Sequence, residues 1–398
     1  MSDDLQRLGT RLAHAGRDRR FTGGGVNPQV QRVSTVLVEK AADLYAPGAW
    51  TYGRHGAGTH EALKLALREI EDASWCAVVS SGLLACTVPV LALASPNAHM
   101  LVTDAVYGPT RRFCSRMLSR WNCEVEYFTP DIGPGIQDLL RPETVLVFLE
   151  SPGSMTFEIS DTPAIAAVAR AAGVPTIMDN TWAAGVFHRP LDLGVDISVQ
   201  STSKYVGGCA DLLSGAIVTR NAGLGARMME TIADLGLSVT ADDAYLVLRG
   251  LRSLTTRLDR HQASGFEIAR WLAGRPEVRR VLHPGLETSP HHAIWKRDFT
   301  GAAGLFGVVL NPVPREGVHA FLNALKLFGL GFSYGGFESL AIHCDPQLQR
   351  TVGTVDLGGP LLRLSIGLED PVDLRADLAA GFAAMAAAGE IGSPPGST

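Results

Sequence analysis

The sequence predicts an α/β fold, with a large domain whose mostly parallel sheet is covered by helices on both faces and a smaller C-terminal α/β domain. Apolar runs without polar alternation, at 76–80, 99–104, 144–150 and 175–180, alternate with helical patterns. Such runs are typical of parallel strands that are buried on both faces of a sheet. The chain has 398 residues and is 46% hydrophobic, so it is long enough for two domains.

The order of the elements divides the chain into parts. Residues 1–58 contain many Gly, Pro and Thr and show little periodicity, so we expect an irregular N-terminal arm with some helix. Residues 59–240 carry the alternation of the large domain. Its helices are predicted at 60–73, 81–95, 109–121 and 162–173, and its remaining strands at 124–128, 196–201 and 215–220.

The pattern changes near residue 240. Residues 241–274 are predicted to form one or two long helices. Afterwards, predicted strands and helices alternate again, the strands at 304–310 and 361–368 and the helices at 315–326 and 373–389. We therefore assign residues 241–398 to a C-terminal α/β domain, whose last residues, GSPPGST, are expected to be disordered.

Charge and hydropathy argue against two classes of partner. The net charge is −5 and Lys and Arg form no dense block, which argues against nucleic acid. The longest apolar run, residues 82–94, is shorter than the stretch of about 20 residues that a membrane-spanning helix needs. The N-terminus, MSDDLQRLGTRLAHAG, is polar and lacks the apolar core of a signal peptide, so we expect a cytoplasmic protein without a membrane partner.

The cysteines and histidines give little sign of a metal site. Six cysteines occur without a CxxC pair, and reduced core thiols in a reducing compartment are their expected state. His283, His291 and His292 lie close together in HPGLETSPHH and could ligate a metal. A solvated loop is the favoured interpretation of this Pro- and Gly-containing stretch, so we expect no metal.

The stretch QSTSKYVGG, residues 200–208, holds a candidate nucleophile. Lys204 follows Ser201 and Ser203 where a predicted strand ends. Most lysines are solvated, and this one could simply reach water. A desolvated lysine can instead lose its proton and form a Schiff base with an aldehyde cofactor, whose phosphate the two hydroxyls could hold. The stretch alone leaves both interpretations open.

Other polar features fall at strand ends, where ligands gather in an open parallel sheet. SSGLL, residues 80–84, opens a predicted helix and would offer backbone N–H groups to a phosphate, although Ser-Gly is also an ordinary helix cap. Tyr107 could stack on a planar ring, and Asp179 could pair with a protonated pyridine nitrogen. A turn tyrosine and a turn-capping aspartate are the ordinary alternatives. Together with Lys204, in this order, these features form the set of groups that binds pyridoxal phosphate.

Longer segments carry a resemblance to a known family. From about residue 10 to residue 388, the chain resembles the Cys/Met-metabolism family of pyridoxal-phosphate enzymes, which has the aspartate-aminotransferase-like fold (PLP fold type I). LESPGS is similar to the corresponding segment of bacterial carbon–sulfur β-lyases, whereas relatives that act at the γ carbon more often read ESPTNP. The resemblance rests on YGRHGAGTH, LESPGSMTFE, MDNTWAAGVF, WKRDFTGAAGLF, SYGGFESL and RLSIGLED.

The resemblance implies a role for each residue around the cofactor. Lys204 would hold pyridoxal 5'-phosphate covalently, Asp179 would pair with its pyridine nitrogen, and Tyr107 would stack on its ring. The phosphate would be bound by further groups of the same chain, namely the amides of Gly82 and Leu83 and the hydroxyls of Ser201 and Ser203.

The resemblance also implies that the active site is shared between subunits. Tyr52 and Arg54, in TYGRHG, resemble residues that reach a neighbouring subunit's site. Arg54 would bind the phosphate there, and Tyr52 would lie near phosphate and substrate. The implied assembly is a homo-oligomer, a tetramer built as a dimer of dimers.

Substrate binding falls to the C-terminal domain in this resemblance. Arg363 and Ser333 match the residues that bind the substrate carboxylate, and a bidentate arginine suits a carboxylate. Tyr334 would border the substrate side chain. The implied catalytic residues are Lys204, Tyr107 and Tyr52.

The implied reaction is an α,β-elimination of L-cystathionine, or of a similar cysteine S-conjugate, to a thiol such as homocysteine, pyruvate and ammonia. Two pairs of positions depart from the family pattern and leave the substrate open. Cys209 and Ala210 stand where His and Ser are frequent. Phe332 and Tyr334 stand where β-lyases commonly have Tyr and Trp.

Alternative functions remain at this point. One is a different enzyme of the same family: a γ-lyase, a γ-replacement synthase or a carbon–sulfur lyase for a specialised metabolite. An aminotransferase is favoured by the fold but disfavoured by Tyr52 and Arg54. A non-catalytic cofactor-binding protein is disfavoured because Lys204, Asp179 and Arg363 are all present.

Overall fold

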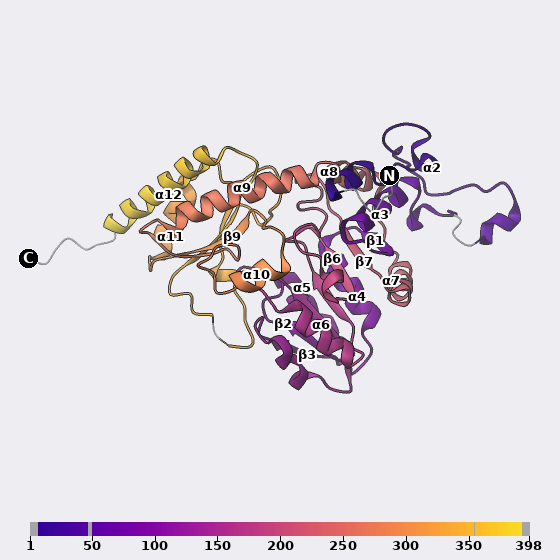
Figure 1. Ribbon diagram of the computed structural model, residues 1–398, viewed down its shortest axis with the longest axis horizontal. Coiled ribbons are helices and arrows are strands. Elements are labelled where there is room, and N and C mark those ends of the chain that lie inside the picture. The colour runs from indigo at the N-terminus through magenta and orange to yellow at the C-terminus, as the bar shows by residue number, and fades with distance from the viewer. Residues whose placement is uncertain (1–6, 47–49, 354, 392–398) are drawn as a thin grey trace, which may run out of the picture.

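Two β-sheets organise the chain, one in each domain. The computed structural model describes residues 7–46, 50–353 and 355–391. Figure 1 shows the large domain, in indigo to magenta, on the right and the small domain, in orange to yellow, on the left. The helix α9 (Leu254–Ala273) joins them, since Leu258 packs in the large-domain core and Leu272 in the small-domain core.

The large sheet contains seven strands in the order β1-β7-β6-β5-β4-β2-β3. The strands are β1 (Trp75–Val79), β2 (His99–Thr103), β3 (Glu124–Phe128), β4 (Thr144–Glu150), β5 (Thr176–Asp179), β6 (Ile197–Gln200) and β7 (Gly215–Thr219). Neighbouring strands from β6 to β3 are parallel, whereas β7 is antiparallel to both β1 and β6. The prediction of a mostly parallel sheet is confirmed.

All strands of this sheet except β7 end at the same edge. The strand β1 runs in the direction of β6, because both are antiparallel to β7. The segments that follow β1, β2 and β6 contain Gly82, Tyr107 and Lys204, and Asp179 is the last residue of β5. The fold therefore brings the four strand-end features to one edge of the sheet.

Helices cover both faces of the large sheet. On one face lie α4 (Gly82–Leu93), α5 (Gly108–Arg116) and α7 (Ala222–Asp234), and on the other lie α3 (Gly58–Glu71), α6 (Thr162–Ala171) and α8 (Ala241–Leu251). The helix α3 forms because its apolar side chains repeat with helical spacing. The buried stripe consists of Leu63, Ala66, Leu67 and Ile70. The helix α7 is an element that the sequence analysis did not identify.

The small sheet is antiparallel throughout. Its order is β10-β11-β9-β8, from the strands β8 (Val278–Leu282), β9 (Leu305–Leu310), β10 (Leu340–His343) and β11 (Leu361–Ser365). The helices α11 (Arg315–Ala324) and α12 (Pro371–Ile391) pack with α9 over it, around Phe306, Phe321 and Phe382, while α10 (His292–Asp298) precedes β9. The C-terminal segment 392–398, predicted to be disordered, lies outside the described residues.

The N-terminal arm extends from the body of the large domain. It contains α1 (Leu8–His14), α2 (Arg19–Thr22) and the 3₁₀ turns Ala41–Tyr45 and Gly53–His55. Figure 1 shows part of the arm projecting on the right. Leu37 and Tyr45 are each 90% exposed, so a single chain leaves large apolar side chains of the arm in water.

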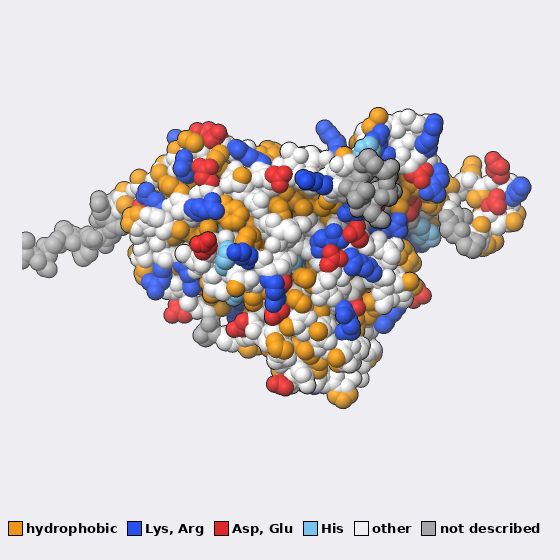
Figure 2. Space-filling view, viewed as in Figure 1, with side chains coloured by type: hydrophobic (Ala, Val, Ile, Leu, Met, Phe, Trp, Pro, Cys, Tyr) orange, Lys and Arg blue, Asp and Glu red, His pale blue; other side chains and the backbone are white. Residues whose placement is uncertain are grey.

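The surface mixes both signs of charge. On the face shown in Figure 2, Lys and Arg side chains alternate with Asp and Glu, with apolar side chains between them. Within the described residues, no helix combines the length and the apolar character that crossing a membrane requires.

Candidate active site

A cavity lies where the carboxyl edge of the large sheet meets the small domain. Its walls come from the ends of β1, β2, β4, β5 and β6 or the segments after them and from three segments of the small domain. Among the residues predicted from the sequence, the cavity is lined by Gly82, Leu83, Tyr107, Asp179, Ser201, Ser203, Lys204, Tyr334 and Arg363. The fold thus brings these side chains together, whereas their roles stay predictions.

Lys204 lies in a turn just after β6 and points at the small domain. Its Nζ donates a hydrogen bond of 2.7 Å to Ser333 Oγ and lies 5.0 Å from the centre of the Tyr334 ring. Burial and, to a smaller extent, the positive charge of Arg363 lower the pKa of Lys204 to about 8, against the opposing effect of Glu338. A larger fraction of this amine is therefore neutral near pH 7 than of a solvated lysine.

Asp179 ends β5 in a buried position. Its Oδ1 accepts from the Thr181 hydroxyl at 2.6 Å and from the Thr181 amide at 3.0 Å, and its Oδ2 accepts from the Cys86 thiol at 3.3 Å. Burial raises the pKa of this carboxyl above its usual range, against the effect of the Thr181 bonds. In the part of the chain that the structure describes, no Lys, Arg or His forms an ion pair with it. A buried carboxylate in this situation needs a cationic partner from a ligand.

The first turn of α4 lines the part of the cavity where a phosphate could bind. Ser81 caps the helix by accepting the Leu84 amide at 3.2 Å. The amides of Gly82 and Leu83 belong to the first turn, whose N–H groups have no partner within the helix. A Cβ on Gly82 would lie 2.4 Å from the Cβ of Ser201, so only glycine allows the helix to approach this serine so closely.

The two serines beside Lys204 differ in their bonding. The Ser203 hydroxyl donates to the Ser214 carbonyl at 3.0 Å and accepts the Ser214 amide at 2.9 Å, so it is already engaged with the backbone. Ser201 lies against the first turn of α4, and its own amide donates to Thr181 at 2.9 Å. The geometry therefore favours Ser201 over Ser203 as a hydroxyl donor to a bound phosphate.

Arg363 and Ser333 lie together on the small-domain wall. Arg363 is on β11, is only 8% exposed and donates to the Ser333 carbonyl at 3.2 Å. Its guanidinium lies 5.9 Å from the centre of the Tyr334 ring. No acidic side chain among the described residues forms an ion pair with Arg363. The guanidinium thus faces the cavity as a cation that a substrate carboxylate could bind.

Tyr52 and Arg54 do not line this cavity. Arg54 donates to the Ala233 carbonyl at 3.3 Å and lies near the Tyr52 ring, with 5.7 Å between its guanidinium carbon and the ring centre. Tyr52 is 45% exposed and forms a β-bridge with Thr35 in the arm. That they serve the site of a neighbouring subunit stays a prediction.

Several lining residues were missed by the sequence analysis. Glu150 ends β4 directly opposite Asp179, and its Oε2 accepts the Tyr107 amide at 2.6 Å. Burial, and then the charge of Asp179, raise the pKa of Glu150 well above its usual range. Its position at the end of the apolar run TVLVFLE is the same signal that identified Asp179. Cys86 and Thr181, which bond Asp179, carry no comparable sequence signal.

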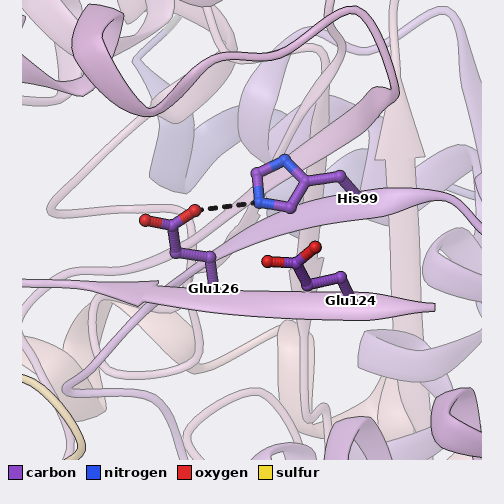
Figure 3. Close-up of side chains that lie close together, drawn as sticks. All are labelled: His99, Glu124 and Glu126. Carbon is purple, nitrogen blue, oxygen red and sulfur yellow. Dashed lines mark hydrogen bonds and ion pairs between the residues drawn. The ribbon is translucent and has the colours of Figure 1, made fainter.

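Outside the cavity, on β2 and β3, three residues of types that can ligate a metal lie close together. Figure 3 shows His99, Glu124 and Glu126 close together. The His99 ring bonds Glu126 at 3.2 Å, while Arg141 bonds Glu124 at 2.9 Å and also pairs with Glu126. Because Arg141 already pairs with both carboxylates, we interpret the cluster as an ion-pair network at the sheet edge.

The histidine-rich loop differs from the expectation of a solvated loop. His283 is buried, its Nδ1 accepts the Gly285 amide at 3.1 Å, and its ring centre lies 4.7 Å from that of Phe266. Burial lowers the pKa of His283 to about 4. The loop folds back because this imidazole packs among aromatic side chains of the small domain.

The described site fits pyridoxal phosphate. Asp179 lacks a cation that a pyridinium nitrogen would supply, the first turn of α4 offers amides to a phosphate, and Lys204 is a partly neutral amine. Tyr107 is 42% exposed and lines the same cavity. All six cysteines are free thiols.

Comparison with known proteins agrees with this fit. A cystathionine beta-lyase of Salmonella typhimurium is 43% identical to the chain, covering 95% of it and 98% of that protein. The cystathionine beta-lyase MetC of Escherichia coli is 41% identical, with the same two coverages. The crystal structure of metB from Corynebacterium glutamicum is similar with a TM-score of 0.90 and 28% identity, covering 96% of this chain and 99% of that one. Residues 9–383 match the family described as Cys/Met metabolism PLP-dependent enzyme, so the chain belongs to this family.

Proposed function

We propose that the protein is a carbon–sulfur β-lyase that cleaves L-cystathionine, or a similar cysteine S-conjugate, by α,β-elimination. The products are a thiol such as homocysteine, pyruvate and ammonia, with one water consumed. The observation that carries the proposal is the position of the Lys204 amine between Ser333 and the ring of Tyr334, in the same cavity as Arg363 and Asp179. The names of the two similar lyases support it.

In such an elimination, several side chains of the protein have separate roles. The bound cofactor supplies an electron sink for the charge that develops at Cα. Arg363 binds the substrate carboxylate, and the Lys204 amine then removes the Cα proton and returns a proton to the departing sulfur. Asp179 holds the proton on the pyridine nitrogen, and Tyr107 covers one face of the ring. Water hydrolyses the released enamine to pyruvate and ammonia.

The outer wall of the cavity bears on the choice of substrate. Leu213 and Phe332 line it and are 69% and 75% exposed. In this chain, therefore, the mouth offers apolar surface to whatever group the sulfur carries. Cysteine S-conjugates with apolar substituents are thus candidate substrates beside cystathionine.

We also propose that the enzyme is a homo-oligomer, a tetramer of paired dimers, in which Tyr52 and Arg54 complete a neighbour's site. The exposed apolar side chains of the arm support an interface there. A cytoplasmic location is proposed with it, supported by the free state of all six cysteines.

Identification of the keto acid tests the proposed reaction. Purified enzyme loaded with cofactor is incubated with L-cystathionine, and Lys204→Ala serves as the inactive control. Pyruvate with homocysteine is the expected result. 2-Oxobutyrate with cysteine would assign γ-elimination instead, and the absence of any keto acid would reject cleavage of cystathionine altogether.

A further inference from the structure

The connection between β10 and β11 leaves the small domain and contacts the large one. The two strands pair in antiparallel fashion, with Ile342 opposite Arg363. The connection is therefore the extended tip of the hairpin that carries the carboxylate-binding arginine. Figure 1 shows it, in orange, extending from the small sheet toward the large domain. Residue 354 apart, it belongs to the described residues.

Asp104, directly after β2, holds this connection. It is fully buried. Its Oδ1 and Oδ2 accept the Thr351 amide at 2.9 and 2.8 Å, and Oδ2 also accepts the Val352 amide at 2.8 Å. The partners are separated by 247 and 248 residues in the sequence and belong to different domains. One carboxylate of the large domain thus fixes two consecutive backbone amides of the small one.

Arg111 neutralises Asp104 and links it to Tyr107. Its Nη2 donates to Asp104 Oδ1 at 2.5 Å, and its Nη1 donates to Thr351 Oγ1 at 2.7 Å. Its guanidinium carbon lies 4.1 Å from the centre of the Tyr127 ring. In α5 the amide of Arg111 donates to the Tyr107 carbonyl at 3.0 Å. Asp104 and Arg111, which bind the connection, therefore flank Tyr107 in the sequence, and Arg111 is bonded to its backbone.

Arg350, the residue before Thr351 in the connection, contacts a second wall of the cavity. Its Nη2 donates to Thr156 Oγ1 at 2.5 Å, and it lies 3.7 Å from the Glu158 carboxylate. The Met155 and Phe157 side chains of this wall line the cavity. The contacts at Asp104 and at Arg350 together fasten the connection to the large domain at two points.

We propose that Asp104 is a positioning residue that sets the distance between Tyr107 on the large domain and Arg363 on the small domain. The inference rests on the proposed roles of these two residues as ring-stacking and carboxylate-binding groups. A substrate whose carboxylate is bound by Arg363 must also reach the cofactor ring that Tyr107 covers, so the two domains have to be held in register. Asp104 achieves this because it bonds the tip of the Arg363 hairpin next to the Tyr107 turn.

The test compares Asp104→Asn with Asp377→Asn in the cofactor-loaded enzyme. Asp377 is a matched control, because this buried carboxylate also accepts loop amides, those of Lys326, Leu327 and Phe328 at 2.8 to 3.1 Å, but entirely within the small domain. The probe is L-alanine, which has a carboxylate for Arg363 and no β-substituent to lose. Its Kd is measured from the change in cofactor absorbance, together with the Tm and the hydrogen exchange of the Thr351 and Val352 amides.

The expected result separates positioning from stability. Asp104→Asn should retain cofactor, lose exchange protection at Thr351 and Val352, and raise the Kd for L-alanine about 10- to 100-fold, as misplacing a binding group by about 1 Å does. Asp377→Asn should lower Tm and leave that Kd unchanged. A wild-type Kd in Asp104→Asn would overturn the proposal, as would equal Kd increases in both variants.

A milder variant covers the case in which Asp104→Asn does not fold. Thr351→Val removes only the hydroxyl that accepts from Arg111, and it should raise the Kd for L-alanine about threefold, the effect of one hydrogen bond. An unchanged Kd in Thr351→Val would then overturn the proposal. If the wild-type enzyme binds L-alanine but does not cleave cystathionine, the proposed reaction fails while the positioning role of Asp104 is still tested.

Discussion

At the scale of single residues, the site depends on burying charges that lack partners within the chain. Asp179 and Arg363 have opposite charges at opposite walls of one cavity, and neither forms an ion pair within the described residues. Each therefore retains a binding capacity that a ligand can use. Lys204 lines the same cavity and donates to Ser333, and burial is the main reason why its pKa is lowered to about 8.

Replacing Arg363 by alanine should weaken every α-amino acid substrate. The loss of one partner of a buried charge pair costs about 2–5 kcal/mol, so kcat/KM should fall at least about 30-fold, mainly through KM. Steady-state kinetics on L-cystathionine measure this. Arg297→Ala, which removes the ion pairs of a half-exposed arginine outside the cavity with Asp161 and Asp298, is the control and should leave kcat/KM unchanged. Similar kinetics in the two variants would reject Arg363 as the carboxylate-binding group.

Some site residues could be predicted from the sequence and others could not, for a physical reason. Gly82, Asp179 and Lys204 follow apolar strands, and in a parallel sheet the ends of such strands meet. Cys86 contacts Asp179 only because α4 packs beside β5 across the sheet face. A contact of that kind depends on tertiary packing, which leaves no local pattern.

At the scale of elements, the helices and strands with a clear apolar pattern could be predicted from the sequence. The helix α3 was predicted by its apolar spacing, and the buried strands by their unbroken apolar runs. The antiparallel insertion of β7 between β1 and β6 was not predicted, because strand direction is set by partners remote in sequence. The strands β8 and β10 were missed as well, because they lack a long unbroken apolar run: two arginines interrupt β8, and β10 has only three apolar residues.

The end of α3 carries a buried acid whose ionisation opposes folding. Glu71 is fully buried, and its Oε1 accepts the Ser198 hydroxyl at 2.8 Å. Burial raises the pKa of Glu71 from 4.5 to about 7. The folded chain therefore binds this proton more tightly than the unfolded chain, and stability should fall as the pH rises from about 4.5 to about 7.

Replacing Glu71 by glutamine should remove this part of the pH dependence. The amide keeps an acceptor for Ser198 and never ionises. Between about pH 5 and about pH 8, the free energy of unfolding of the variant should rise relative to that of wild type. The rise should reach up to about 3 kcal/mol, at 1.36 kcal/mol per pKa unit. Thermal unfolding of both proteins across this range measures the gain. A constant difference in Tm at every pH would contradict the assignment.

At the scale of the whole molecule, the site is assembled from distant parts of the chain. The large sheet supplies the groups proposed to bind the cofactor, the small domain supplies Arg363 and Ser333, and the connection at Thr351 joins the two. The contact between Asp104 and Thr351 spans 247 residues, so no local sequence pattern predicts it. The arm lies away from the cavity of its own chain, and this directs attention to a second subunit.

Complementation between two inactive variants tests the shared site. Lys204→Ala lacks the nucleophile, and Arg54→Ala lacks the group proposed to reach the neighbour. A mixed dimer collects both defects in one site and leaves the other whole, so activity should return to at most about half by symmetry. Subunit exchange is verified by mass on differently tagged chains. Exchange without any return of activity would show that Arg54 serves its own subunit.

The central claim, that Lys204 holds the cofactor, is tested most directly by mapping the modified lysine. Borohydride reduction of the loaded enzyme makes the lysine–cofactor bond permanent, and peptide mass spectrometry then locates it. The chain offers five lysines, Lys40, Lys64, Lys204, Lys296 and Lys326, so the result discriminates clearly. The account predicts the cofactor mass on the peptide that contains Lys204 and on no other. Modification of any of the other lysines, or of none, would contradict it.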